Sequence, residues 1–267
     1  MIYNTKIIDY GDYLHIQWYD HHLIRSEVSE EMEQGIKEVS DQAIINDYHL
    51  PEEEIEDDKK KEHSLKTSVN RSKNNLYRIA RSNEWELFIT ITFDRKITDS
   101  SNYKIVSNKI TSFLNNLRKR GSENLKYLIV PELHKDGKHY HFHGLLSGAD
   151  SLILEDSGHK DRYGATIYNI LNWKIGFTTA QKIKNQSAVR NYIGKYITKE
   201  LMNKIKYKKR YFASKNCYVA PEEYYQFSID ELYAMFGDRI SYVKTQTING
   251  INRIKYLEVK KDIDKDV

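Results

Sequence analysis

The hydrophobic residues repeat most regularly between Ser100 and Gly121, at intervals of three and four positions. This spacing places them on one face of an amphipathic helix, which Asp99 or Ser100 is expected to cap and Gly121 to end. A stripe of this kind indicates a packed core rather than a binding site. It consists of Val106, Ile110, Phe113, Leu114 and Leu117.

Hydrophobic and polar residues alternate instead from Leu87 to Asp94, which predicts a strand. Before it, residues 70–83 have the period of a helix, with Leu76, Ile79 and Ala80 facing inward. After the first helix described, residues 148–172 are rich in Gly, Asp and Ser and are expected to form an insertion with His159 in solvent. Residues 173–184 are predicted to form another strand.

The stretch from Tyr127 to Leu146 is predicted to be a β-hairpin, because two apolar runs flank an Asp136-Gly137 pair that tolerates a tight reversal. Symmetric closure about that pair places Glu132 directly opposite His141. Pro131 would interrupt the hydrogen bonds of a hairpin with a two-residue loop, so a four-residue loop or a bulge is favoured. A shift of one residue would break the alignment.

The two ends of the chain read differently from its middle. Residues 1–20 predict two short strands around Gly11-Asp12, expected as an edge hairpin of the main sheet, and residues 26–46 predict an acidic helix. Residues 50–62 are too polar to bury much surface and are expected to be a linker. We therefore divide the chain into an N-terminal hairpin and acidic helix or linker (1–63), a core domain (64–220) and a C-terminal extension (221–267).

Charge is distributed unevenly along the 267 residues. Residues 26–62 carry fourteen acidic and four basic side chains, whereas residues 63–215 carry twenty-nine basic and twelve acidic ones. A basic block favours a polyanionic partner, most simply nucleic acid, although solvated helix faces are also rich in Lys. A single Cys217, no signal pattern and no apolar run long enough for a bilayer predict a protein of the cytoplasm without a membrane partner.

The predicted hairpin carries metal-ligand residue types at a useful spacing. Side chains alternate along a strand, so His139, His141 and His143 project to one face, with Glu132 opposite His141. A His-x-His pair with one carboxylate leaves coordination positions open, which suits a catalytic ion better than a structural zinc. The simpler alternative is a histidine-rich surface strand, but three alternating histidines with an opposed glutamate favour metal binding.

A second stretch with chemical potential begins at Ser187, which is expected to cap a helix through residue 200. Its residues Tyr192, Lys195, Tyr196 and Lys199 would lie on one face, so that each phenol has an ammonium group beside it. A nearby cation stabilises a phenolate and makes it a better nucleophile. Alternatively, the helix simply contacts DNA phosphates.

In chain order, the FITITFD strand, the Glu132 and His141-Phe142-His143 hairpin and the Tyr192-to-Tyr196 element resemble the three motifs of the HUH endonuclease superfamily. The histidine motif precedes the tyrosine motif, as in the replication initiators of rolling-circle phages and plasmids. The resemblance covers residues 64–220. It implies an α+β fold, with a ferredoxin- or RRM-like antiparallel sheet and helices packed on one face.

The resemblance also implies roles for individual residues. His141, His143 and Glu132 would hold Mg²⁺ or Mn²⁺, and Tyr192 would attack single-stranded DNA at a replication origin to leave a 5′-phosphotyrosine link. Lys195 would stabilise the developing charge, and Tyr196 matches the second tyrosine of the paired-tyrosine subgroup. Further contacts to DNA are expected from Arg190, Lys199, Lys208, Lys209 and Arg210.

Two other functions fit the same residues. One is a single-strand DNA transposase with HUH chemistry, and the other is a non-catalytic nucleic-acid-binding protein whose histidines hold a structural metal. The sequence has no Gly-x4-Gly-Lys-Ser/Thr phosphate loop, so unwinding is expected to come from a helicase of the bacterial host, with a host polymerase extending the 3′ end.

Overall fold

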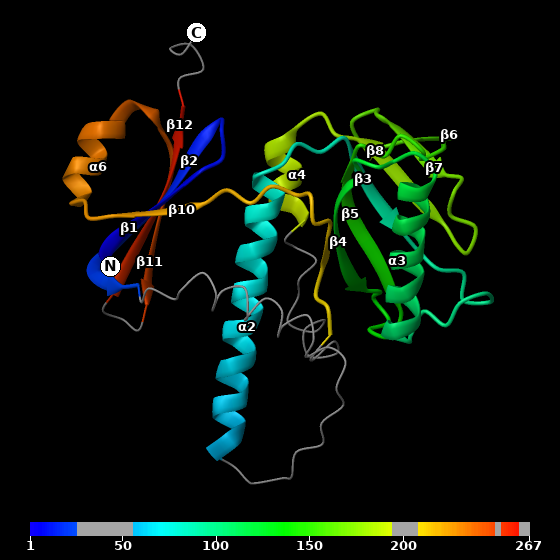
Figure 1. The fold of residues 1–267 in the computed structure, drawn as a ribbon, viewed down its shortest axis with the longest axis horizontal. Coiled ribbons are helices and arrows are strands. Elements are labelled where there is room, and N and C mark those ends of the chain that lie inside the picture. The colour runs from blue at the N-terminus through cyan, green and yellow to red at the C-terminus, as the bar shows by residue number, and fades with distance from the viewer. Residues whose placement is uncertain (26–55, 194–207, 249–251, 262–267) are drawn as a thin grey trace. The chain divides into compact units, whose positions relative to one another are not determined.

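The computed structural model describes residues 1–25, 56–193, 208–248 and 252–261 (Figure 1). The chain divides into two compact units, one made of Met1–Tyr48 with Val219–Val267 and the other of His49–Tyr218. Each unit contains one antiparallel sheet with its own buried core. The predicted α+β class with antiparallel strands is confirmed. The acidic helix predicted for residues 26–46 lies outside the described residues.

The larger unit contains a seven-stranded sheet in the order β6-β7-β8-β3-β5-β4-β9. Strands β3 and β5 lie at its centre, so the FITIT and HFH segments are neighbours that pair directly. The strands are β3 (Leu87–Ile91), β4 (Lys126–Leu133), β5 (Tyr140–Ser147), β6 (Leu154–Lys160), β7 (Thr166–Ile170), β8 (Thr178–Lys182) and β9 (Phe212–Ala213).

Helix α3 (Tyr103–Lys119) packs against one face of this sheet. All five residues of its predicted hydrophobic stripe are buried, and Tyr103 makes an edge-to-face contact with Tyr140 of β5 at 5.3 Å between ring centroids. The predicted caps were wrong, because Asn102 accepts hydrogen bonds from the backbone of Lys104 and Ile105. Gly121, at φ 113°, follows the helix as predicted.

Helix α2 (Glu56–Arg81) is longer than predicted. Leu76, Ile79 and Ala80 are buried as expected, but the helix begins at Glu56, within the segment predicted to be a linker. Acidic residues precede lysines by four positions in this segment, as in Glu56 and Lys60, which favours a helix without requiring burial. The prediction considered only the missing apolar surface and was therefore wrong for residues 56–62.

The central hairpin has the predicted register, with Glu132 paired to His141 and Pro131 paired to Phe142. The N–H of His134 donates to the carbonyl of His139, and hydrogen-bonded pairs alternate along an antiparallel ladder. Pro131 therefore falls in a non-hydrogen-bonded pair, where its missing N–H costs nothing. The four-residue loop that resolved the proline problem is confirmed, with Gly137 at φ 61°.

The predicted insertion at residues 148–172 is instead part of the sheet. Strands β6 and β7 form a hairpin that joins the sheet edge through β8, and His159 is exposed as expected. Its alternation was obscured by the polar composition of β6, of which no residue is fully buried. The strand predicted for residues 173–184 is shorter, because β8 covers only Thr178–Lys182.

The smaller unit joins segments from both ends of the chain in a five-stranded sheet, in the order β10-β1-β2-β12-β11. The N-terminal hairpin is present as predicted, but it pairs with C-terminal strands rather than with the main sheet. Helix α6 (Ile229–Phe236), followed by η2 (Gly237–Arg239), buries Leu232 against Ile16 and Leu257. The strands are β1 (Ile2–Asp9), β2 (Tyr13–Ile24), β10 (Glu222–Tyr225), β11 (Ile240–Ile248) and β12 (Asn252–Lys260).

No helix in the described ranges combines the length and the apolarity that a bilayer crossing requires.

Candidate metal centre and tyrosine

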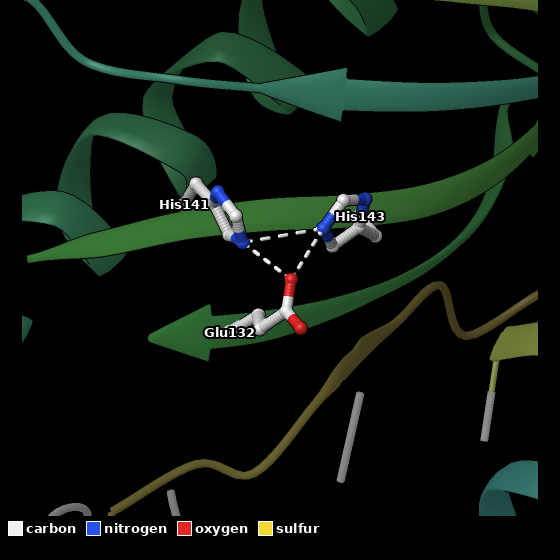
Figure 2. Close-up of side chains that lie close together, drawn as sticks. All are labelled: Glu132, His141 and His143. Atoms are coloured by element: carbon white, nitrogen blue, oxygen red, sulfur yellow. Dashed lines mark hydrogen bonds and ion pairs between the residues drawn. The ribbon is translucent and has the colours of Figure 1, made fainter. Parts of the chain in front are cut away.

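Three side chains converge on the face of the large sheet that lies opposite α3. Figure 2 shows Glu132 of β4 pointing toward His141 and His143 of β5. The Nε2 atom of His143 lies 2.8 Å from a carboxylate oxygen of Glu132 and 3.3 Å from Nε2 of His141. The same carboxylate oxygen also contacts Nε2 of His141. One potential ligand atom from each residue thus lies within 4.8 Å of the others.

The cluster follows directly from strand geometry. His141 and His143 are two residues apart on β5 and therefore project to the same face, and the register of β4 brings Glu132 opposite His141. Gly144 faces the other way, where an added Cβ would lie 2.7 Å from a side-chain carbon of Ile129. The glycine therefore lets the buried core approach this strand closely behind the histidines.

The donor set fits a divalent cation. Two imidazole nitrogens 3.3 Å apart can both reach one ion at metal–nitrogen distances of about 2.0–2.1 Å, and the carboxylate adds an oxygen ligand. A set of two imidazoles and one carboxylate matches sites that keep positions free for water or substrate. Glu132, His141 and His143 can therefore hold a metal, whose identity the donor types leave open.

The protonation of the cluster also suits metal binding. Burial opposes ionisation of Glu132, but the hydrogen bonds from His141 and His143 outweigh it and lower the pKa of the carboxyl to about 2. For His143, burial is the main cause that lowers the pKa of the imidazole, and the Glu132 hydrogen bond only partly opposes it. A carboxylate and a neutral imidazole are the forms that bind cations.

Two residues of β3 support His143, and sequence reasoning missed both. The hydroxyl of Thr90 lies 3.0 Å from Nδ1 of His143, so that this nitrogen can donate its proton and leave Nε2 free as a ligand. The ring of Phe88 stacks on the imidazole at 6.0 Å between centroids. The signal was the even spacing of Phe88 and Thr90 within a strand, but it becomes informative only once β3 is known to pair with β5.

The other two histidines of the hairpin have separate environments. His139, predicted on the same face, directs its Nδ1 to the Asp136 carboxylate at 2.7 Å and so belongs to the turn. His134 stacks on His141 at 4.3 Å between centroids, and burial lowers the pKa of its imidazole. Glu132, His134 and His141 also line a cavity of about 480 Å³ together with Arg95, Leu133, Lys135 and Asp136. The cluster thus opens onto a space lined by cationic side chains.

Tyr192 lies next to the cluster. Its ring is 41% exposed and meets Phe88 edge to face at 5.7 Å between centroids, and the same Phe88 ring stacks on His143. Two successive ring contacts therefore connect the predicted nucleophile to a predicted metal ligand. The other members of the predicted tyrosine motif, Lys195, Tyr196 and Lys199, lie outside the described residues.

Helix α4 (Gln186–Tyr192) is fastened to the segment before β3, and this attachment places Tyr192. Asn185 caps the helix by accepting from the backbone of Ala188, so the cap predicted at Ser187 was wrong. Gln186 exchanges two hydrogen bonds with the backbone of Trp85, at 2.7 and 3.1 Å. Because Trp85 precedes β3 by two residues, these bonds set α4 beside Phe88.

Arg190 was predicted to contact DNA, and its position contradicts that prediction. Its side chain is only 4% exposed, pairs with Glu84 and donates to the backbone carbonyl of Asn83 at 3.2 Å. The basic charge suggested a surface role, but Arg190 lies on the side of α4 that faces the domain interior. It is a further anchor of α4 to the segment before β3.

The trailing basic residues differ in exposure. Lys208 and Lys209 are exposed, with their ammonium groups near the rings of Tyr103 and Phe212. Arg210 is half-buried and donates to the hydroxyls of Ser68 and Ser72 on α2, at 2.7 and 2.9 Å. The two lysines remain available for phosphates, whereas Arg210 also has a structural role.

Comparison with known proteins gives a family match that spans this site. Residues 86–201 match the family model of the replication-associated protein of the ORF2 type. The match supports a role in DNA replication. It contains β3, the hairpin with Glu132, His141 and His143, and Tyr192. Neither the curated proteins nor the solved structures gave a match.

Proposed function

We propose that the larger unit is a metal-dependent endonuclease and strand transferase of the HUH type, which initiates rolling-circle replication by nicking single-stranded DNA. One observation carries the proposal. A cluster suited to a divalent cation lies two ring contacts from an exposed tyrosine, and both fall within a segment that matches a replication-associated family.

The reaction follows from the chemistry of these groups. The Tyr192 oxygen attacks the phosphorus of the scissile phosphodiester, the bond from phosphorus to the 3′ oxygen breaks, and a 5′-phosphotyrosine forms. The phenol loses its proton and the departing 3′ oxygen gains one, which leaves a 3′-OH that primes synthesis. A bound Mg²⁺ or Mn²⁺ would withdraw negative charge from the phosphate. Reversal with a different 3′-OH rejoins the strand.

The surroundings of the cluster suit a nucleic-acid substrate. Arg95 and Lys135 line the cavity beside Glu132 and His141, where they can attract phosphates that flank the scissile one. Lys195 is the residue we assign to charge stabilisation during attack, and Tyr196 is assigned to a second transfer. The physiological partners we propose are single-stranded DNA at an origin, a host helicase and a host polymerase.

A covalent adduct is the decisive test. The protein should be incubated with Mn²⁺ and a panel of single-stranded oligonucleotides that covers candidate origins, then analysed by denaturing electrophoresis. An oligonucleotide should remain attached to the wild type and to Tyr163→Phe, a control at another exposed tyrosine of the same unit, but not to Tyr192→Phe. Binding without any adduct across the panel would contradict the proposal and favour a non-catalytic DNA-binding protein.

A further inference from the structure

The sheet of the smaller unit has one face covered by α6 and one face that carries aromatic and basic side chains. Ile16, Leu257 and Val259 point toward α6 and are buried with Leu232. Directly opposed residues of antiparallel strands share a face, and successive residues alternate between the two faces. The residues that alternate with this core therefore lie on the opposite face, whose composition can be read from the register.

Every strand of this sheet contributes a tyrosine to that opposite face. Tyr256 of β12 is paired with Gln17 and with Lys244, while Tyr242 of β11 is paired with Glu258. Tyr19 is paired with Ile254, two residues from Tyr256 and on the same face. We call these residues the tyrosine face, and its members are Tyr3, Tyr19, Tyr224, Tyr242 and Tyr256.

Ring contacts confirm that the remaining members belong to the same face. Tyr3 of β1 meets Tyr224 of β10 at 4.7 Å and Tyr19 at 6.4 Å between centroids. Each tyrosine is partly accessible, and Tyr242 is 49% exposed. In the described part of this unit, the helical elements are α6 and η2, and α6 packs on the other face.

Cations accompany the rings. The guanidinium of Arg25 lies 4.4 Å from the centroid of Tyr224, and the ammonium of Lys6 lies 6.0 Å from it. Lys244 is exposed beside Tyr256. The face also carries two carboxylates, of which Glu222 is paired with Lys6 at 3.3 Å, and Glu258 lies opposite Tyr242.

We propose that the tyrosine face is a second binding surface of this protein, and that it binds single-stranded DNA by stacking unpaired bases on its tyrosines. Aromatic rings on an open sheet, with Lys and Arg beside them, supply π-surfaces for bases and charge for phosphates. A duplex offers only its phosphates to such a face, because its bases are already stacked. The inference does not rest on the nicking chemistry.

Two matched double variants of the full chain test the proposal. Tyr242→Ser with Lys244→Ala removes a ring and a charge from the tyrosine face. Tyr233→Ser with Lys255→Ala makes the same changes on the α6 side, where Tyr233 is 38% exposed and Lys255 lies 5.5 Å from its ring. Fluorescence anisotropy with a labelled single-stranded oligonucleotide, in EDTA to prevent cleavage, should show at least about five-fold weaker binding for the first variant alone.

Crosslinking makes the result independent of the affinity of the larger unit. Photocrosslinking to iodouracil-substituted single-stranded DNA, followed by mass spectrometry, should place adducts on tyrosines of this face in the wild type. Adducts confined to residues 56–218, or equal affinity of the two double variants, would overturn the proposal. A matched RNA that competes better than DNA would overturn the assignment to DNA, and duplex DNA that competes equally would overturn base stacking.

Discussion

The hydroxyl of Thr90 lies 3.0 Å from Nδ1 of His143, on the side of the imidazole opposite to Glu132. Because a hydrogen bond to one ring nitrogen orients the other, Thr90 is expected to position His143 as a ligand. Thr90→Val keeps the shape and removes the hydroxyl, and it should weaken Mn²⁺ binding by about 10- to 100-fold. Isothermal titration calorimetry measures this change.

The controls for Thr90 use its neighbours in chemistry and in space. Thr90→Ser keeps a hydroxyl and should largely restore Mn²⁺ affinity, whereas Thr179→Val changes the exposed residue paired with Thr90 on β8 and should leave affinity unchanged. If Thr179→Val and Thr90→Val weaken binding equally, the hydroxyl of Thr90 has no special role.

Loss of either cluster histidine should abolish metal binding and cleavage while the fold persists. His141→Ala and His143→Ala each remove one nitrogen ligand, whereas His159→Ala alters an exposed histidine outside the site and serves as control. Metal affinity, adduct formation and thermal melting should be measured on the same samples. Wild-type cleavage by His141→Ala in the presence of Mg²⁺ would contradict the assignment, and EDTA should stop cleavage reversibly.

The two tyrosines of the predicted motif should have separable roles. Tyr192→Phe keeps the ring on Phe88 but deletes the attacking oxygen, so the first cut should be lost. Tyr196→Phe should permit that cut and impair joining of a second strand end. Two differently labelled oligonucleotides distinguish cutting from joining, and mass spectrometry that finds the nucleotide on Tyr196 alone would reverse these roles.

Basic residues should separate into DNA contacts and structural anchors. Lys208→Ala and Lys209→Ala should each reduce the slope of log affinity against log salt by about 1, because one phosphate contact is lost. Arg190→Leu should leave that slope unchanged but lower the free energy of unfolding by about 1.5–3 kcal/mol, since charged hydrogen bonds inside the domain disappear. A salt slope that changes for Arg190→Leu as it does for the lysines would show that Arg190 contacts DNA.

The ionised Glu132 should stabilise the metal-free fold in a defined pH range. Its folded pKa of about 2 is below the ordinary 4.5, so this stabilisation is complete above pH 4.5 and is lost as the pH falls toward 2. Urea unfolding in EDTA should therefore show a difference between wild type and Glu132→Gln that is constant near neutral pH and shrinks below pH 4.5. A difference that grows as the pH falls would contradict the assigned ionisation.

The metal cluster could be predicted from sequence because its geometry is local. Glu132, His141 and His143 lie on adjacent strands joined by one turn, so strand alternation and the Asp136-Gly137 turn are enough to align them. Thr90 and Arg190 could not be placed in the same way, because their partners are distant in sequence. A hydroxyl in a strand or a cation in a helix has no predictable contact until the strand order is known.

The caps and the end segments failed for a related reason. Several residues before each helix could cap it, and the backbone conformation selects Asn102 and Asn185. The N-terminal hairpin was predicted correctly as an element, but alternation alone does not identify the sheet that a strand joins. Its pairing with β10 and β12 depends on surfaces more than two hundred residues away in the chain.

That pairing has a consequence for the birth of the protein on the ribosome. Strands β1 and β2 emerge before the larger unit, yet their partners β10 and β12 are synthesised after it. The larger unit can therefore fold while the N-terminal hairpin still waits with unpaired edges, and such edges bind chaperones or other chains. The smaller unit is thus expected to assemble after the larger one, which makes its completion a late checkpoint on synthesis of both flanking segments.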